Sequence, residues 1–75
     1  MAMGALRTYD IAPDGVRIVI DWNKFVVGSS MFIPCINTTT AVRQITTITN
    51  DKLQQITTKI VVENGLLGVR VWRTM

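Results

Sequence analysis

The fold is decided by residues 56–73, ITTKIVVENGLLGVRVWR, in which apolar and polar residues alternate on both sides of Asn64-Gly65. Alternation with a period of two is typical of a half-buried strand, and Asn-Gly between two such runs is typical of a tight hairpin loop. The sequence therefore predicts a C-terminal hairpin over residues 55–73, with a two-residue loop of type I′.

A two-residue loop also determines which side chains share a face of the hairpin. One face is expected to form the core, with the cross-strand pairs Thr58 with Val71, Ile60 with Val69 and Val62 with Leu67. The opposite face would carry the pairs Thr57 with Trp72, Lys59 with Arg70 and Val61 with Gly68. Two opposed cations repel, and a one-sided sheet does not need a large aromatic on its polar face. We therefore expect something to cover this second face, unless a three-residue loop changes the register.

Two further elements are predicted upstream of the hairpin. Residues 38–50 place Ala41, Val42, Ile45 and Ile48 at helical spacing after a run of possible N-cap residues, although the many threonines are weak helix formers. Residues 30–34 are a short run that follows a Gly-Ser-Ser turn and ends at Pro34, which is typical of an edge strand. We expect a helix over 38–50 and a strand over 30–34.

The N-terminal third is predicted to contribute a second hairpin. Pro13-Asp14-Gly15 is a favourable turn sequence and residues 16–22 alternate, so a hairpin is expected over residues 6–22. Residues 1–5 show no periodicity and are expected to be disordered. The chain of 75 residues is thus predicted to be a single domain, 1–75. Its predicted class is α+β, with a small antiparallel sheet of about four to five strands packed on one helix.

The residue inventory argues against catalysis and metal binding. The chain has no histidine and a single cysteine, Cys35, so it lacks the commonest general base, an internal disulfide and a Cys/His zinc set. No phosphate-binding loop or dinucleotide motif is present. We expect neither an enzyme nor a bound cofactor or metal. The absence of a long apolar run and of a signal peptide predicts a cytoplasmic protein that does not enter a membrane.

The charge of the chain favours acidic partners such as nucleic acid, because the net charge is +3 and the isoelectric point is near 9.6. The candidate binding residues are assigned to the second face of the hairpin: Thr57, Lys59, Arg70, Trp72 and Arg73. Cations neutralise phosphate, and an aromatic side chain on a sheet can stack with bases. The alternative is that Trp72 packs against the N-terminal hairpin or a second subunit, or that the face binds another protein.

Two segments resemble a known group of proteins. Residues 28–34, GSSMFIP, and residues 68–73, GVRVWR, are similar to the Gly-Ser-x-x-Phe-x-Pro segment and the C-terminal hairpin of small uncharacterised tailed-bacteriophage accessory proteins. This resemblance implies no assigned activity and no site residues. It implies a protein that acts in the host cell cytoplasm by binding nucleic acid, a host enzyme or a defence complex, either as an inhibitor or as a homo-oligomer.

Overall fold

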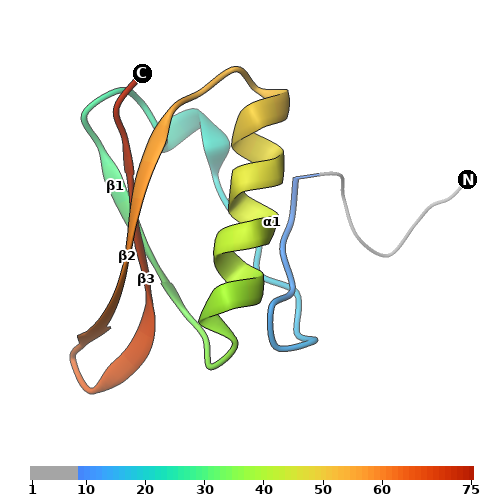
Figure 1. Ribbon diagram of the computed structural model, residues 1–75, viewed down its shortest axis with the longest axis vertical. Helices are drawn as coiled ribbons and strands as arrows, with labels where there is room; N and C mark the ends of the chain where they lie inside the picture. Colours follow the sequence, from blue (N-terminus) through green and yellow to red (C-terminus); the bar gives the residue numbers. More distant parts are fainter. Residues whose placement is uncertain (1–8) are drawn as a thin grey trace, which may run out of the picture.

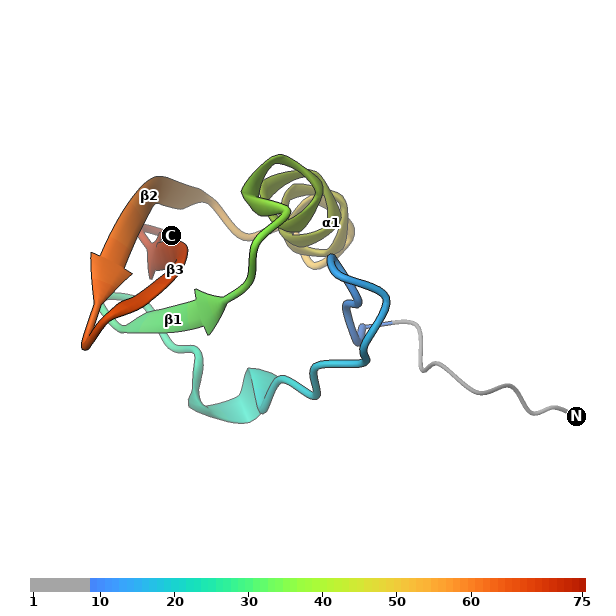
Figure 2. The same ribbon diagram turned by 90° about the horizontal axis from the view of Figure 1, so that it is seen from below.

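The computed structural model describes residues 9–75 and shows one helix packed on one face of a three-stranded antiparallel sheet (Figure 1, Figure 2). The elements in chain order are the 3₁₀-helix η1 (Trp22–Lys24), β1 (Ser30–Pro34), α1 (Thr38–Asp51), β2 (Ile56–Glu63) and β3 (Leu66–Arg73). The strand order is β1-β3-β2, so β3 is the central strand. The α+β class is confirmed, whereas the predicted four to five strands exceed the three that the described residues form.

The β2–β3 hairpin has the predicted two-residue loop. Asn64 and Gly65 both adopt left-handed backbone conformations, with φ of 51° and 79°, as a type I′ loop requires. The predicted register is confirmed as well, because Lys59 lies opposite Arg70. The Asn-Gly dipeptide therefore specifies both the hairpin and the distribution of side chains over its two faces.

The core lies between α1 and the inner face of the sheet, which is the face turned towards the helix. Val69 and Val71 of β3 are fully buried in one cluster with Ala41 and Ile45 of α1 and with Ile33 of β1. Side chains alternate along a strand. The odd-numbered side chains of β3 therefore point to the helix, and the even-numbered ones point away from it.

The threonines of α1 are accommodated by hydrogen bonds within the helix. Asn37 caps the first turn, where its side chain accepts a hydrogen bond from the Thr40 N–H at 3.2 Å. The Thr49 hydroxyl donates to the carbonyl oxygen of Ile45 at 2.9 Å, so this threonine is buried without an unsatisfied donor. α1 ends at Asp51, just beyond the predicted range of 38–50.

The prediction of an N-terminal hairpin over residues 6–22 was wrong for the part that the structure describes. Residues 1–8, and with them the predicted disorder of residues 1–5, lie outside the described residues. The turn forms, because the Gly15 N–H donates to the carbonyl of Ala12 at 3.1 Å. Among the described residues, however, strand-type pairing of its flanks is limited to an isolated bridge between Ile11 and Ile18. Val19 is 65% exposed, and residues 16–22 do not form the expected half-buried strand.

The physical reason is that polar groups of this segment bond to α1 and its N-terminus instead of forming a ladder. The Ala12 N–H donates to the side-chain oxygen of Gln44 in α1 at 3.0 Å. The Asp14 carboxylate accepts the N–H groups of Ile36 and Asn37, both at 2.8 Å. These bonds span more than 20 residues of chain, and a local alternation pattern carries no information about them.

Asp14 attaches the N-terminal turn to the start of α1, and the Asp14→Ala variant should have a lower melting temperature near neutral pH. The backbone N–H groups of Asn37 and Ile36 lower the pKa of Asp14 below its usual 3.8. A lowered folded-state pKa stabilises the protein above the unfolded-state pKa, and the contribution is lost as the pH falls through the folded-state value. The difference in melting temperature between wild type and variant should therefore narrow below about pH 4.

A matched control for this variant is Asp51→Ala, which removes an exposed carboxylate from the last turn of α1. A negative charge at a helix C-terminus is unfavourable, so its removal should not lower the melting temperature. Thermal unfolding followed by circular dichroism from pH 7 to pH 3 measures both variants. Equal melting temperatures for wild type and Asp14→Ala at pH 7 would rule out the anchoring role.

Candidate interface on the open sheet face

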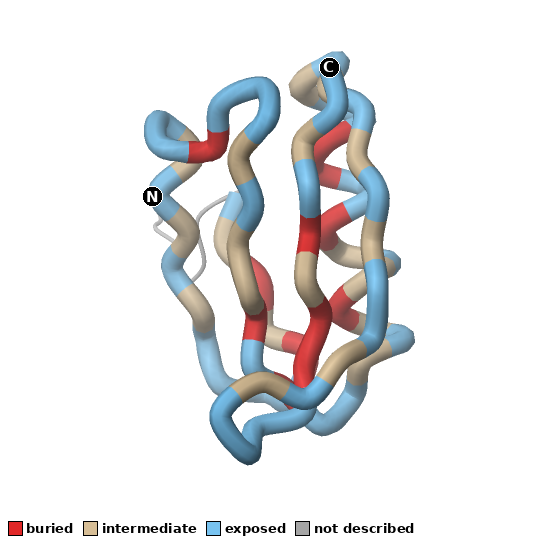
Figure 3. The backbone as a smooth tube through the Cα atoms, turned by 90° about the vertical axis from the view of Figure 1, so that its left-hand side faces the viewer, coloured by how far each residue is buried: buried red, intermediate tan, exposed pale blue. Residues whose placement is uncertain are grey.

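The sheet has an open face, which is the face that points away from α1. In Figure 3 the three strands lie side by side towards the viewer with the helix behind them, and no other segment of residues 9–75 crosses them. The residues of the open face are Ser30, Phe32 and Pro34 from β1, Leu66, Gly68, Arg70 and Trp72 from β3, and Thr57, Lys59, Val61 and Glu63 from β2. The cover that the sequence led us to expect on this face is not provided by the described part of the chain.

Four of the five predicted site residues come together on the open face. The strand register aligns them in two neighbouring rows across the sheet, which are Ser30, Trp72, Thr57 and then Phe32, Arg70, Lys59. The two central positions belong to β3, and the flanking positions belong to the two edge strands. The hairpin loop and the β1–β3 register thus align the site residues, and α1 adds no side chain to this face because it packs on the other side of the sheet.

Arg73 is the fifth predicted residue, and it does not join the other four. It lies opposite Ile56, and strand alternation places it on the inner face, since Arg70 and Trp72 occupy the open face. Its guanidinium donates to the carbonyl oxygens of Phe25 at 2.9 Å and Met75 at 3.0 Å. Arg73 therefore ties the end of β3 to the segment before β1 and is not part of the open face.

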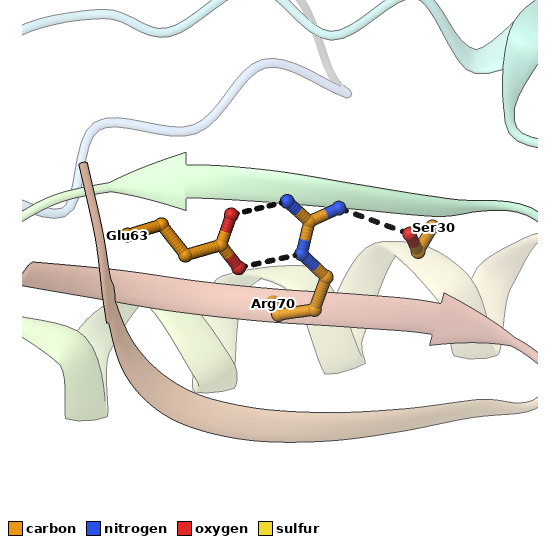
Figure 4. A network of polar contacts seen from close by, with 3 residues as sticks. All are labelled: Ser30, Glu63 and Arg70. Atoms are coloured by element: carbon orange, nitrogen blue, oxygen red, sulfur yellow. Dashed lines mark hydrogen bonds and ion pairs between the residues drawn. The ribbon is translucent and has the colours of Figure 1, made fainter.

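The Arg70 side chain is held in place by two polar neighbours on the open face (Figure 4). It forms a two-pronged ion pair with Glu63, with Nε 2.8 Å from Oε2, and it donates from its other terminal nitrogen to Ser30 Oγ at 2.9 Å. The hydrogen bonds between the two groups lower the pKa of Glu63 and raise the pKa of Arg70. The repulsion expected between Lys59 and Arg70 is thus offset by a carboxylate on the same face.

The open face also presents two aromatic rings. Trp72 is 36% exposed, and the half-buried Phe32 lies beside Arg70, whose guanidinium carbon is 5.7 Å from the centre of the Phe32 ring. A cation at this distance from an aromatic face is attracted by the ring electrons.

Sequence reasoning missed Phe32 and Glu63 as members of this face. Phe32 lies in a short run of three apolar residues that has no alternation, so the pattern could not show which of them faces the core. Glu63 could have been found, because it is four positions from Lys59 and therefore on the same face of the predicted strand.

Lys59 is the most available cation of the open face. It is exposed, and no carboxylate lies within ion-pair distance of it in the part of the chain that the structure describes. Arg70 keeps two of its five N–H donors, since three are used by Glu63 and Ser30. The face therefore combines one exposed ammonium group, one guanidinium held by two polar neighbours, and two aromatic rings.

Three other kinds of feature would bear on function among the described residues: a metal site, a membrane-spanning helix and a reactive cysteine. Within residues 9–75, no group of three or more His, Cys, Asp or Glu side chains could hold a metal ion. Across the same range, no helix has the length and apolar character needed to cross a bilayer. Cys35 is buried, and burial together with the charge of Asp14 raises the pKa of its thiol, so it stays protonated near neutral pH.

Comparisons of this chain with protein-family models, with curated proteins and with solved structures found no match. Its function has to be inferred from the chemistry of the open face.

Proposed function

We propose that this protein binds nucleic acid with unpaired bases through the open face of its sheet. The observation that supports this most is the placement of Trp72 and Phe32 beside Lys59 and Arg70 on a face that nothing in residues 9–75 covers. Single-stranded nucleic acid is commonly bound by exposed aromatic rings that stack with bases and by cations that follow the backbone. The open face offers both within two neighbouring rows.

The polar, charged and aromatic residues of the open face each have a role in this proposal. Trp72 and Phe32 stack with bases, Lys59 contacts phosphate, and the Thr57 hydroxyl donates a hydrogen bond. Arg70 is oriented by Glu63 and Ser30, so its two remaining N–H donors are available for a phosphate or a base edge. α1 lies behind the sheet and takes no part.

The second candidate function is binding of a protein partner through the same face. Two observations favour it: Glu63 already neutralises the charge of Arg70, and Leu66 adds an apolar side chain that is mostly exposed. Exposed apolar groups around a tryptophan are typical of protein interfaces. In the phage context suggested by the sequence resemblance, a host enzyme or defence complex would be the partner, and the host cytoplasm would be the place of action.

The proposed function is tested by fluorescence anisotropy with a labelled mixed-sequence single-stranded oligonucleotide at low and high salt. We expect binding tighter than about 10⁻⁴ M at low salt, and weaker binding as salt rises. A double-stranded oligonucleotide of the same sequence should bind more weakly, because its bases are not free to stack. Failure to bind either form at low salt would overturn the proposal and leave the protein-binding function.

Glu63→Gln tests the proposed contact between Arg70 and phosphate, because it removes the only carboxylate among the residues assigned to the open face. We expect it to free Arg70 for phosphate and to strengthen oligonucleotide binding by about three- to tenfold, with the salt dependence increased by about 0.7 in log–log slope. Asp51→Asn makes the same change in net charge at the end of α1 and should have little effect. Unchanged or weaker binding by Glu63→Gln would argue that Arg70 does not contact phosphate.

A further inference from the structure

β2 is an edge strand with a free side. It pairs only with β3 among residues 9–75, and its other side faces no strand. On β3, the backbone groups of Leu67 and Arg73 bond to the β1 side. Because hydrogen bonding alternates along a central strand, the odd-numbered residues of β3 bond to β1 and the even-numbered residues, Gly68, Arg70 and Trp72, bond to β2. The alternation then leaves the N–H and C=O groups of Thr58, Ile60 and Val62 directed to the free edge.

The free edge is apolar where it extends beyond the cover of α1. The side chains of Ile60 and Val62 are 54% and 65% exposed, and Leu67, which lies opposite Val62, is 41% exposed. All three are on the inner face, where Val69 and Val71 are completely buried by α1. An uncovered edge of β-branched residues with unpaired backbone groups is a template for adding another strand.

We infer that β2 pairs in antiparallel orientation with β2 of a second copy of this chain, about a two-fold axis at Val61. The outward backbone groups belong to even-numbered residues, so even-numbered residues must face each other across the axis. This condition is met when the two-fold axis passes through a residue position, and it is not met when the axis passes midway between two residues. The choice among them is made by charge.

The charges of β2 select the register centred on Val61. This register places Lys59 opposite Glu63 of the second copy, and two-fold symmetry repeats this attractive pair. A register centred on Lys59 would oppose two lysines, and one centred on Ile60 would place Lys59 opposite Val61. A lysine on an edge strand usually prevents pairing, but here its complement lies at the symmetric position.

The same register pairs Ile60 with Val62 of the second copy on the inner face, again twice. It therefore covers the exposed apolar side chains and satisfies the outward backbone groups in one step. Glu63 can accept from both Arg70 and the incoming Lys59, since its side chain remains 33% exposed and a carboxylate has about four acceptor sites. The result is a continuous six-stranded sheet with the two open faces side by side.

Cysteine cross-linking tests this register directly. In the proposed dimer the two Val61 residues form a non-hydrogen-bonded pair with Cα atoms about 4.5 Å apart, within disulfide range. Val61→Cys should become a disulfide-linked dimer under mild oxidation. Lys59→Cys and Ile60→Cys should not, because neither residue faces its own symmetry mate. The wild type, whose Cys35 is buried, is the baseline.

Sedimentation equilibrium without nucleic acid tests the charge argument. The wild type should show twice the monomer mass, and Lys59→Glu should raise the dimer dissociation constant by about tenfold or more. Lys24→Glu, which makes the same charge change at an exposed position in η1, should not. A monomeric mass at every concentration up to about 1 mM, or cross-linking through Lys59→Cys or Ile60→Cys instead of Val61→Cys, would overturn the inference.

Discussion

Gly68→Val should destabilise the protein by about 3 kcal/mol, because β1 can no longer pair closely with β3. Gly68 lies opposite Pro34 in the centre of the sheet. A Cβ atom there would press on the carbonyl oxygen of Ile33 and lie 2.7 Å from Cζ of Phe32. The carbonyl belongs to the backbone of β1, so it cannot move without disturbing the ladder. Urea denaturation of the variant measures the loss.

The control for this prediction is Gly65→Ala, which changes the other glycine of the hairpin. A Cβ at Gly65 meets nothing within 4 Å, but its φ of +79° is strained for any other residue. We expect a cost of about 1 to 2 kcal/mol, all of it from the backbone. If Gly68→Val is no less stable than Gly65→Ala, the close approach of β1 to β3 is not a requirement of the fold.

The hairpin was predictable because its signals are local. Asn64 and Gly65 determine a loop of two residues, and the period of two on either side then determines the register and both faces. The N-terminal segment was not predictable for the opposite reason. The same kind of alternation is present in residues 16–22, but Asp14 and the Ala12 N–H have partners that lie far along the chain. A segment with an alternating pattern does not form a strand when no neighbouring strand pairs with it and its polar groups bond to distant residues.

The candidate site was predictable only where alternation could be extended from the hairpin. Thr57, Lys59, Arg70 and Trp72 follow from the loop. The same rule places Arg73 on the inner face, so its assignment to the second face of the hairpin was wrong. The contribution of β1 could not be derived. Its pairing with β3 crosses α1 in sequence, so the position of Phe32 beside Arg70 depends on the complete fold.

Trp72→Ala should weaken binding of a single-stranded oligonucleotide by about 5- to 150-fold, the loss expected for one stacked base. Trp72 is partly exposed at the centre of its row, so its removal leaves the core intact. Stacking involves no ions, and the salt dependence of binding should therefore stay the same. Lys59→Ala should show the opposite pattern, with a smaller loss and a salt slope reduced by about 0.7.

Trp72→Phe is the matched control, because it keeps an aromatic ring at the same position and should recover much of the affinity. Anisotropy titrations at several salt concentrations measure all three variants, and circular dichroism shows whether each is folded. A protein partner that binds the open face would also lose affinity when Trp72 is removed. The loss caused by Trp72→Ala therefore does not by itself show that the residue stacks with a base. Recovery by a smaller ring, together with an unchanged salt slope, is expected only for base stacking. If Trp72→Ala and Lys59→Ala change the salt slope equally, Trp72 supports the cations and does not stack with a base.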